Sequence, residues 1–223
     1  MKQLIFILIF LVAGVMPSSS HNSNNSSNTI ADQASYISTA YHINQEAIEI
    51  ALKGYQKLRN LRKLANLQYL TIADFSKPSN EERLFIIDMQ LMQVVVKSLV
   101  AHGKNSGLKV ANHFSNQLSS FQSSLGFYIT GEIYKGKHGA SLELNGVEKG
   151  INDQAKERAI VIHGADYVSN RYIQQQGYIG RSLGCPAVPN NQVATIINTI
   201  KGASCLFIYA PNSQYQKKST YLD

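Results

Sequence analysis

The sequence predicts a β-rich α+β fold that begins with a helical segment. Between residues 43 and 70, apolar residues recur at three- and four-residue steps, as they do along one face of a helix. After Pro78 the pattern changes to short runs rich in β-branched residues and separated by turns, which is typical of strands. A hydrophobic content of 44% and a charged content of 16% in 223 residues are those of an ordinary globular chain with a core.

The helical segment is expected to begin at a cap formed by Asn44 and to pack against the domain that follows. Gly54 and Asn60 weaken its middle, so one long helix and two shorter helices both fit the pattern. A further helix is expected to open at Pro189 and to close at Gly202.

Six segments have the composition of strands, and the first two are expected to form a hairpin. Between the second and the third lies a polar stretch, residues 103–124, whose length is typical of functional loops. The predicted strands are residues 83–88, 94–100, 125–133, 141–144, 159–162 and 204–209.

The first residues predict export. Lys2 precedes an apolar run over residues 4–15, and small residues follow at 18–20, which is the order of a secretory signal. The run is shorter than the ~20 residues that a membrane-spanning helix needs. Cleavage near Ser20 is favoured, and retention as an uncleaved anchor is the alternative. We therefore expect an exported protein of the periplasm or cell envelope, without an integral membrane span after signal cleavage.

The composition along the chain predicts five parts. They are a signal peptide (1–20), a disordered Ser/Asn-rich tether (21–33), a helical segment (34–78), a β-rich domain (79–213) and a polar C-terminal tail (214–223).

The net charge of +7 favours a polyanionic partner without choosing among nucleic acid, anionic lipid and cell-wall polymer. Export and the absence of a basic-aromatic motif argue against nucleic acid. Of the two cysteines, Cys205 lies in an apolar run that predicts a buried strand, and Cys185 lies in a loop between glycine and proline. A disulfide between them is the less favoured interpretation, because a buried single cysteine behaves as a small hydrophobic residue.

A histidine and a cysteine stand where a nucleophilic site would need them. His163 closes a predicted strand, and Cys185 follows 22 residues later, just ahead of a helix. A thiol attacks carbonyl groups only as thiolate, so it needs a neighbouring base or a positive field. Gly164 and Gly184 flank the two residues, and a glycine beside a nucleophile lets backbone N–H groups approach a carbonyl oxygen. This pattern fits a thiol nucleophile with a histidine base, but one histidine and one cysteine at this spacing do not identify such a site by themselves.

The sequence motifs around these residues resemble the catalytic signature of the peptidoglycan L,D-transpeptidase family. The signature is a His-Gly at a strand end followed by Ser-x-Gly-Cys, and the chain has Arg-Ala-Ile-Val-Ile-His-Gly at 158–164 and Gly-Arg-Ser-Leu-Gly-Cys-Pro-Ala at 180–187. The likeness is closest to the murein branch with Gly-Arg-Ser-x-Gly-Cys-Pro. It extends upstream through residues 101–107, 123–126 and 136–139, and so covers roughly residues 70–210.

The resemblance implies a β-sandwich or barrel catalytic domain and a specific chemistry. The cysteine would take the acyl group of a peptidoglycan stem peptide, releasing the terminal D-alanine and leaving a thioester. Transfer to an amine of a second stem peptide would form a 3-3 cross-link. With water as acceptor the enzyme would be an L,D-carboxypeptidase, and a non-catalytic cell-wall binding protein is the third possibility. No cofactor is implied.

The resemblance also assigns roles. Cys185 would be the nucleophile, His163 the base, and the carbonyl of Gly164 the group that orients the imidazole. N–H groups around Gly184 and Cys185 would form the oxyanion hole.

The resemblance also suggests residues for substrate contacts. Ser182 would support the loop or touch substrate, and Arg181 would offer a cation to a substrate carboxylate. Lys104 and Ser106 would either contact carboxylates of the stem peptide or belong to the surface of the loop. Ala187 departs from the family, since many relatives have arginine there.

Other histidines and tyrosines have weaker interpretations. His102, His113 and His138 have a spacing that fits no compact set of metal ligands, so we expect no metal. Tyrosines 167, 172 and 178, between the histidine and the cysteine, would form a lid or pack as ordinary aromatic residues.

Overall fold

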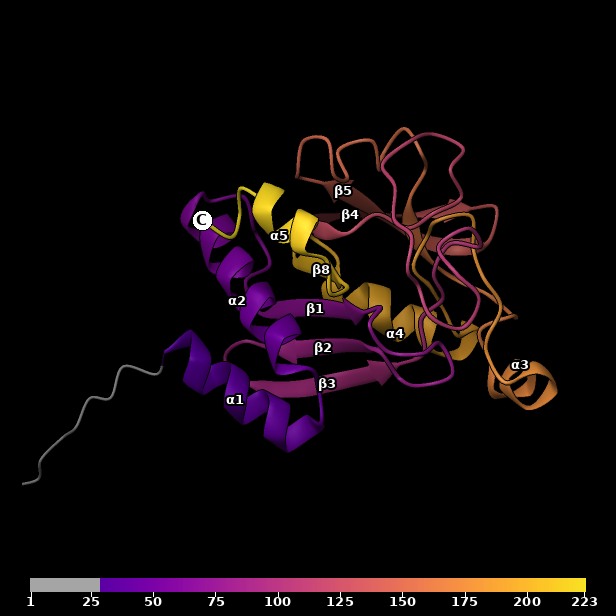
Figure 1. The fold of residues 1–223 in the computed structure, drawn as a ribbon, viewed down its shortest axis with the longest axis horizontal. Helices are drawn as coiled ribbons and strands as arrows, with labels where there is room; N and C mark the ends of the chain where they lie inside the picture. The colour runs from indigo at the N-terminus through magenta and orange to yellow at the C-terminus, as the bar shows by residue number, and fades with distance from the viewer. Residues whose placement is uncertain (1–28) are drawn as a thin grey trace, which may run out of the picture.

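The computed structural model describes residues 29–223. The predicted signal peptide and the first part of the predicted tether, up to residue 28, lie outside the described residues. Figure 1 shows a sheet with the N-terminal helices along one side and a group of loops at the opposite end. No helix within the described residues has the length and the apolar character to cross a membrane.

The fold is β-rich α+β, as predicted. The helices are α1 (Ile30–Tyr41), α2 (Gln45–Asn60), α3 (Asn170–Gln176), α4 (Asn190–Ile200) and α5 (Ser213–Lys218). The strands are β1 (Tyr69–Asp74), β2 (Leu84–Asp88), β3 (Gln93–Ser98), β4 (Gly126–Gly136), β5 (Gly139–Gly146), β6 (Val161–Gly164), β7 (Ala187–Val188) and β8 (Cys205–Tyr209).

The eight strands form one sheet in the order β3-β2-β1-β8-β4-β5-β6-β7. The first two predicted strands form the expected antiparallel hairpin, β2–β3. Just beyond β3, Ala101 bridges to Ala187 of β7, and its N–H donates to the Ala187 carbonyl at 2.8 Å. This contact brings the two edges of the sheet together, so the sheet is a nearly closed barrel.

The predicted tether ends earlier than expected, because residues 30–33 are the first turn of α1. Thr29 and Asp32 form a capping box, in which each side chain accepts a hydrogen bond from the other residue's backbone N–H. The prediction of disorder there was wrong because it rested on polar composition and overlooked this cap.

The second helix is one helix rather than two. It begins at Asn44, whose side chain accepts from the Ala47 N–H at 3.2 Å, and it runs through Gly54. A Cβ at Gly54 would lie 2.0 Å from the ring of Phe127 in β4. The glycine therefore marks the close approach of α2 to the sheet and does not break the helix.

The predicted helical segment extended to residue 78, but the chain turns to strand well before that. Residues 69–74 form β1, which pairs with β2 on one side and β8 on the other. Leu70 and Ile72 are fully buried there. A strand buried on both faces shows a continuous apolar run, and periodicity alone does not distinguish such a run from a buried helix.

The predicted polar tail is also structured. Residues 213–218 form α5, and Tyr215 and Tyr221 are buried. The buried carboxylate of Glu148 accepts from the Tyr215 hydroxyl at 3.2 Å and from the hydroxyl of Ser219. These bonds and the aromatic contacts fasten the C-terminus to the sheet.

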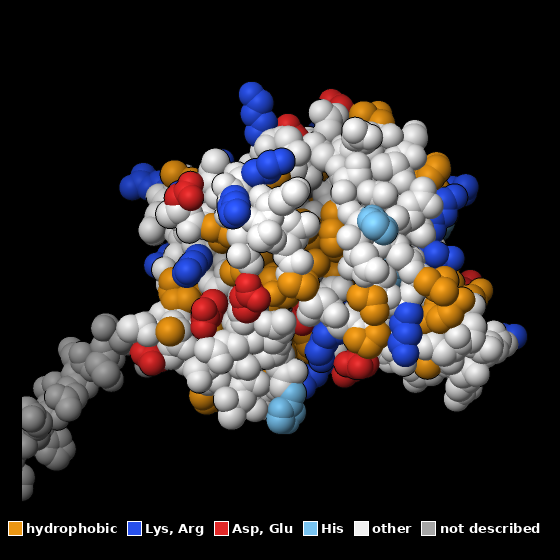
Figure 2. All heavy atoms as spheres, in the orientation of Figure 1, with side chains coloured by type: hydrophobic (Ala, Val, Ile, Leu, Met, Phe, Trp, Pro, Cys, Tyr) orange, Lys and Arg blue, Asp and Glu red, His pale blue; other side chains and the backbone are white. Residues whose placement is uncertain are grey.

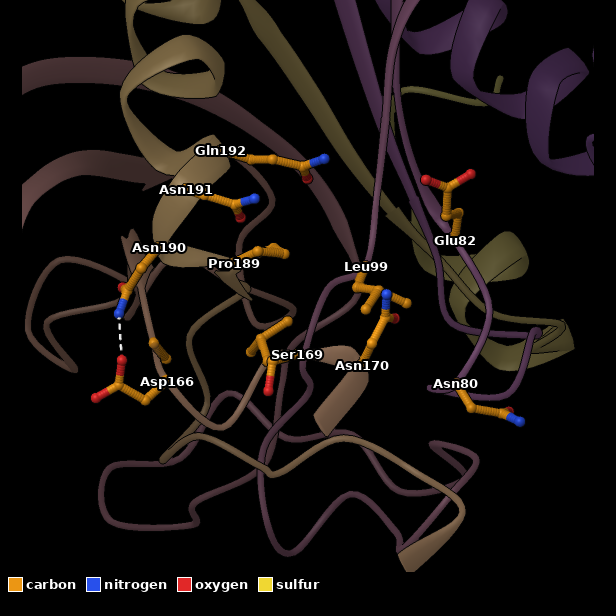
Figure 3. Close-up of a pocket in the computed structure, with 12 residues that line it drawn as sticks. Asn80, Glu82, Leu99, Asp166, Ser169, Asn170, Pro189, Asn190, Asn191 and Gln192 are labelled. Atoms are coloured by element: carbon orange, nitrogen blue, oxygen red, sulfur yellow. Dashed lines mark hydrogen bonds between the residues drawn. The ribbon is translucent and has the colours of Figure 1, made fainter. Parts of the chain in front are cut away.

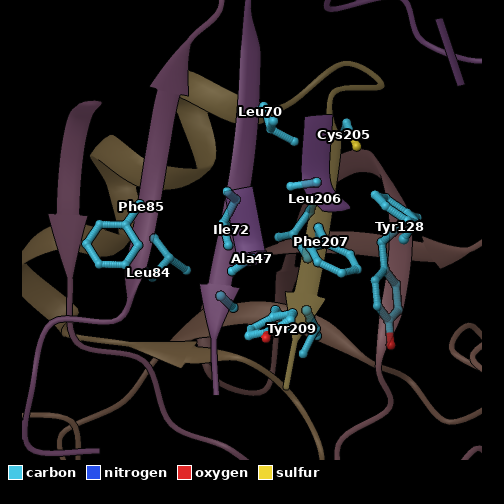
Figure 4. Packing of buried hydrophobic residues seen from close by; sticks show 14 of the residues in the cluster. Ala47, Leu70, Ile72, Leu84, Phe85, Tyr128, Cys205, Leu206, Phe207 and Tyr209 are labelled. Atoms are coloured by element: carbon cyan, nitrogen blue, oxygen red, sulfur yellow. The ribbon is translucent and has the colours of Figure 1, made fainter. Parts of the chain in front are cut away.

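The core lies between the sheet and helices α2 and α4 (Figure 4). Phe127 and Phe207 stack at its centre with ring centroids 4.4 Å apart. Cys205 is fully buried in β8, as predicted, and both cysteines are free thiols.

Candidate active site

Strands β6 and β7 bring the predicted nucleophile and base to the same edge of the sheet. His163 lies in β6, opposite Ser141 of β5 and beside Ala187 of β7. Because β6 and β7 are parallel, Cys185, two residues before Ala187, lies next to Val161. Cys185 and His163 therefore come from adjacent segments at the same edge of the sheet.

The imidazole of His163 is held in one tautomer. Its Nδ1 lies 2.9 Å from the Gly164 carbonyl oxygen, and a carbonyl only accepts, so Nδ1 carries the proton. The lone pair of Nε2 is then available as a base. Burial lowers the pKa of His163 below its ordinary value, and the ring is neutral at neutral pH.

The thiol of Cys185 is also neutral at rest. Its side chain is partly exposed, Sγ donates to the Ala159 carbonyl oxygen at 3.5 Å, and burial raises the pKa of the thiol. Within residues 29–223 no hydrogen bond joins Sγ to the ring of His163. The two groups thus share an edge of the sheet without a direct contact in this state.

Ser182 braces the cysteine loop from inside. It is 4% exposed, its hydroxyl accepts from the Gly184 N–H at 3.0 Å, and it donates to the Cys185 carbonyl at 2.6 Å. Of the two expected roles, loop support fits this geometry, because the buried hydroxyl has both partners inside the loop.

The two N–H groups of the expected oxyanion hole, those of Gly184 and Cys185, differ in their hydrogen bonds. The N–H of Gly184 donates to the Ser182 hydroxyl, whereas the N–H of Cys185 has no hydrogen-bond acceptor within residues 29–223. Gly184 has φ +129°, and a Cβ there would lie 2.9 Å from the Gln122 carbonyl oxygen. This glycine therefore allows close packing of the loop and supplies no free donor.

The polar stretch 103–124, predicted to be functional, packs against the cysteine loop. Ser123 accepts from the Gly103 N–H at 3.0 Å and donates to the Gly184 carbonyl at 3.1 Å. The Lys104 N–H donates to the Ser182 carbonyl at 2.8 Å. The stretch is thus a scaffold that fixes the position of the nucleophile loop.

Arg181 and Lys104 lie together on the exposed rim of this scaffold. Arg181 donates to the carbonyl oxygens of Lys104 and Gly107, at 3.0 and 3.2 Å. The ammonium group of Lys104 lies 4.3 Å from the ring centroid of Phe121. Their contact with substrate stays a prediction.

Two side chains beside the site had no assigned role. The ring of His138, at the exposed β4–β5 turn, stacks on His163 with centroids 4.4 Å apart. Arg158 precedes β6 and reaches the cysteine loop, where one of its terminal nitrogens would lie 3.1 Å from a Cβ at Gly184. Both residues lie in motifs on which the family resemblance rests, His138 in residues 136–139 and Arg158 in residues 158–164. Their position in these motifs is the sequence feature that could have identified them.

His102 is part of the support for the scaffold. It is fully buried, its Nδ1 lies 2.7 Å from a guanidinium nitrogen of Arg83, and its Nε2 lies 3.2 Å from the Gly107 carbonyl oxygen. An arginine only donates, so Nδ1 accepts and the proton is on Nε2. Burial and the neighbouring Arg83 lower the pKa of His102 to about 4.

This low pKa predicts a loss of stability in mild acid. In the unfolded chain the pKa of His102 returns to about 6.5. The unfolded state then binds more protons than the folded state as pH falls from about 6.5 to about 4, so the free energy of unfolding decreases over that window by about 3 kcal/mol. Denaturant unfolding at pH 7 and pH 4.5 checks this. The variant His102→Asn keeps an acceptor for Arg83, and its free energy of unfolding should decrease less between pH 7 and pH 4.5 than that of the wild type. Equal decreases would show that His102 is not the group responsible.

The largest cavity at this end of the molecule is not part of the site (Figure 3). It has a volume of about 660 Å³ and lies beyond the end of β6, where Asn190 donates to Asp166 at 2.6 Å. Gly164 faces Asn190 of α4, so His163, the preceding strand residue, projects from the other face of the sheet. A smaller cavity of about 180 Å³, lined in part by Ala159, Val161 and Lys156, adjoins the acceptor of the thiol.

The positive charge does not gather in one patch on the face seen in Figure 2, where Lys and Arg side chains are spread out and acidic side chains lie among them. This face gives no sign of a track for a nucleic acid.

The sequence matches the family model described as the L,D-transpeptidase catalytic domain over residues 39–209. No curated protein matches the chain. The matching region includes both helix α2 and every strand of the sheet.

Solved structures with related folds share little sequence with this chain. An L,D-transpeptidase from Mycobacterium smegmatis is 13% identical over 64% of this chain and 59% of that chain, with a TM-score of 0.39. A helical cell shape determining protein from Campylobacter jejuni is 13% identical (72% and 57% covered, TM-score 0.44), and an L,D-transpeptidase from Stackebrandtia nassauensis is 9% identical (82% and 79%, 0.39). This chain therefore spans about three fifths of the first of these. Likenesses this distant do not extend any property of those proteins to this chain.

Proposed function

Because the chain belongs to the L,D-transpeptidase catalytic-domain family, we propose that it is a cysteine acyltransferase of peptidoglycan stem peptides. It cleaves before the terminal D-alanine and forms 3-3 cross-links through a thioester on Cys185. The observation that carries the proposal is the fixed imidazole: His163 is neutral, its Nδ1 proton is held by the Gly164 carbonyl, and its basic Nε2 is on the strand beside the cysteine loop.

The first half-reaction transfers one proton twice. Nε2 of His163 takes the proton from the Cys185 thiol as Sγ attacks the carbonyl carbon of the amide that precedes D-alanine. The tetrahedral oxyanion is stabilised by the Cys185 N–H. The imidazolium then gives the proton to the departing amine of D-alanine, and a thioester remains. For this step the S–H bond turns away from the Ala159 carbonyl, which is its partner at rest.

The second half-reaction decides the product. An amine of a second stem peptide attacks the thioester carbon while His163 takes the amine proton, which gives the cross-link. Water in place of the amine gives the L,D-carboxypeptidase product from the same thioester. Both substrates are stem peptides, and we place the reaction in the cell envelope of an exported protein, where peptidoglycan lies.

A non-catalytic cell-wall binding protein is the second candidate. The observation that favours it is the absence of a direct hydrogen bond between Cys185 and His163 in this state. This candidate predicts binding to intact cell wall without any change of the peptide, before and after removal of the thiol.

The proposal predicts release of D-alanine and formation of dimers from tetrapeptide muropeptides, followed by mass spectrometry. The variant Cys185→Ala should give no product, because the thioester cannot form. The matched control Cys205→Ala, which removes the buried thiol of β8, should retain activity if it folds. A carbapenem, whose carbonyl resembles the donor amide, should add its mass to Cys185. An unmodified mass together with no turnover of muropeptides would overturn the proposal and leave the binding protein.

A further inference from the structure

The cation that many relatives carry two residues after the cysteine has no room in this chain. Ala187 is fully buried in β7 and pairs with both Ala101 and His163. The other candidate, Arg181, is on the outer side of the loop, where it donates to the carbonyl oxygens of Lys104 and Gly107. Neither position therefore supplies a positive charge next to the thiol.

Arg158 reaches the inner side of the same loop. Its terminal nitrogens donate to four acceptors in the stretch 115–124, which are carbonyl oxygens and hydroxyls. A Cβ at Gly184 would lie 3.1 Å from one of these nitrogens, so the guanidinium group lies against the residue that precedes Cys185. The absence of a side chain at Gly184 leaves this space to the arginine.

The charge of Arg158 is not neutralised. All four acceptors are uncharged groups, and within residues 29–223 the guanidinium forms no salt bridge with a carboxylate. A half-buried cation without a counter-ion is costly. Such a charge is retained most readily where a negative charge forms during function.

We propose that Arg158 is a positioning residue for Cys185: its positive charge favours the thiolate, and its hydrogen bonds hold the stretch 115–124 against the nucleophile loop. This inference rests on the proposed function, and it assigns to Arg158 the electrostatic task that Ala187 and Arg181 do not perform. It agrees with the opposing influences on the pKa of the thiol, which burial raises and Arg158 lowers.

The other charged or titratable groups near the thiol include Tyr167, His163, and Lys156 and Glu143, which line the small cavity beside the carbonyl that accepts from the thiol. Tyr167, on the loop after β6, has its pKa raised to about 12 by burial and by the nearby cysteine. It is therefore neutral over the range in which the thiol ionises. His163 is on the adjacent strand and is neutral above its lowered pKa. Arg158 is thus the cation whose removal should change the ionisation of Cys185.

The test is the pH dependence of Cys185 alkylation by iodoacetamide, between pH 5 and pH 10. In this reaction the thiol gives its proton to solvent, the S–C bond forms and iodide leaves. The site of the adduct is located by peptide mass mapping, which separates it from Cys205. In Arg158→Gln the midpoint should rise by about one pH unit, and the rate at pH 7 should fall about tenfold, as expected for loss of an opposite charge at close range.

Arg158→Lys and Arg181→Gln are the matched variants. The lysine keeps the charge and should stay close to the wild-type midpoint, even if thermal unfolding shows a looser scaffold. The second variant removes an arginine that also donates to two carbonyl groups, and it should leave the midpoint unchanged. The proposal is overturned if folded Arg158→Gln has the wild-type midpoint. If Arg158→Gln does not fold, a midpoint in Arg158→Lys that is higher by one unit overturns it instead.

Alkylation needs no peptidoglycan, so the two proposals fail separately. A shifted midpoint without turnover of muropeptides would support the role of Arg158 and reject the transpeptidase. Turnover of muropeptides with an unshifted midpoint would support the transpeptidase and reject the role of Arg158.

Discussion

Replacing His163 by glutamine is expected to slow acylation of Cys185 by a factor of about 10²–10⁴, the usual contribution of a general base. Glutamine has nearly the same reach, but its amide nitrogen cannot take a proton at neutral pH. Since the thiol is neutral at rest, with its pKa raised by burial, little thiolate exists without the base. The rate of carbapenem adduct formation, followed by intact mass under single-turnover conditions, measures the effect.

His138→Gln is the matched control for this experiment. Its ring stacks on His163 from the exposed side, and the Coulombic influence of His138 lowers the pKa of His163. The control should keep most of the rate at pH 7.5 and shift the acid limb of its pH profile upwards, because His163 would then hold its proton more tightly. Equal losses in both variants would mean that His163 is not the specific base.

Replacing Arg83 by methionine is expected to lower the free energy of unfolding by about 3–5 kcal/mol, because three buried acceptors lose a charged donor and each unsatisfied buried group costs about 1–3 kcal/mol. Arg83 is fully buried and donates to the carbonyl oxygens of Lys77 and Val100 and to the ring of His102. Burial lowers its pKa to about 9, so it stays charged at neutral pH. Methionine fills part of the volume and leaves these acceptors without donors.

Urea unfolding at pH 7 measures this change, with Arg171→Met as the control. Arg171 is exposed on α3, and its replacement should change stability by no more than about 0.5 kcal/mol. A loss in Arg83→Met as small as that of the control would show that the network around His102 does not hold the scaffold of the cysteine loop.

Much of the sheet could be predicted from local patterns. Runs of β-branched residues and glycine-rich turns predicted the β2–β3 hairpin and the strands around residues 126–136, 139–146, 161–164 and 205–209. Proline at its start and glycine after its end predicted the helix that follows Pro189. The errors occurred at the start of α1, at β1 and at α5. An apolar run buried on both sides has no period that reveals its type, and the hydroxyls of α5 have a use only because Glu148, far away in the sequence, is buried beside them.

The sequence by itself determined the family to which the chain belongs and, through the His-Gly and Gly-Cys motifs, the residues predicted to carry the chemistry, His163, Gly164 and Cys185. The tertiary structure alone decided how those residues are supported. The parallel pairing of β6 and β7 aligns residues 24 positions apart, such as His163 and Ala187. The hydroxyl of Ser182 accepts from the N–H of Gly184, and Arg158 lies against Gly184 in the cysteine loop. The reason is physical: a side chain's identity is local, but its hydrogen-bond partners, its burial and the field that it experiences come from segments far away in the chain.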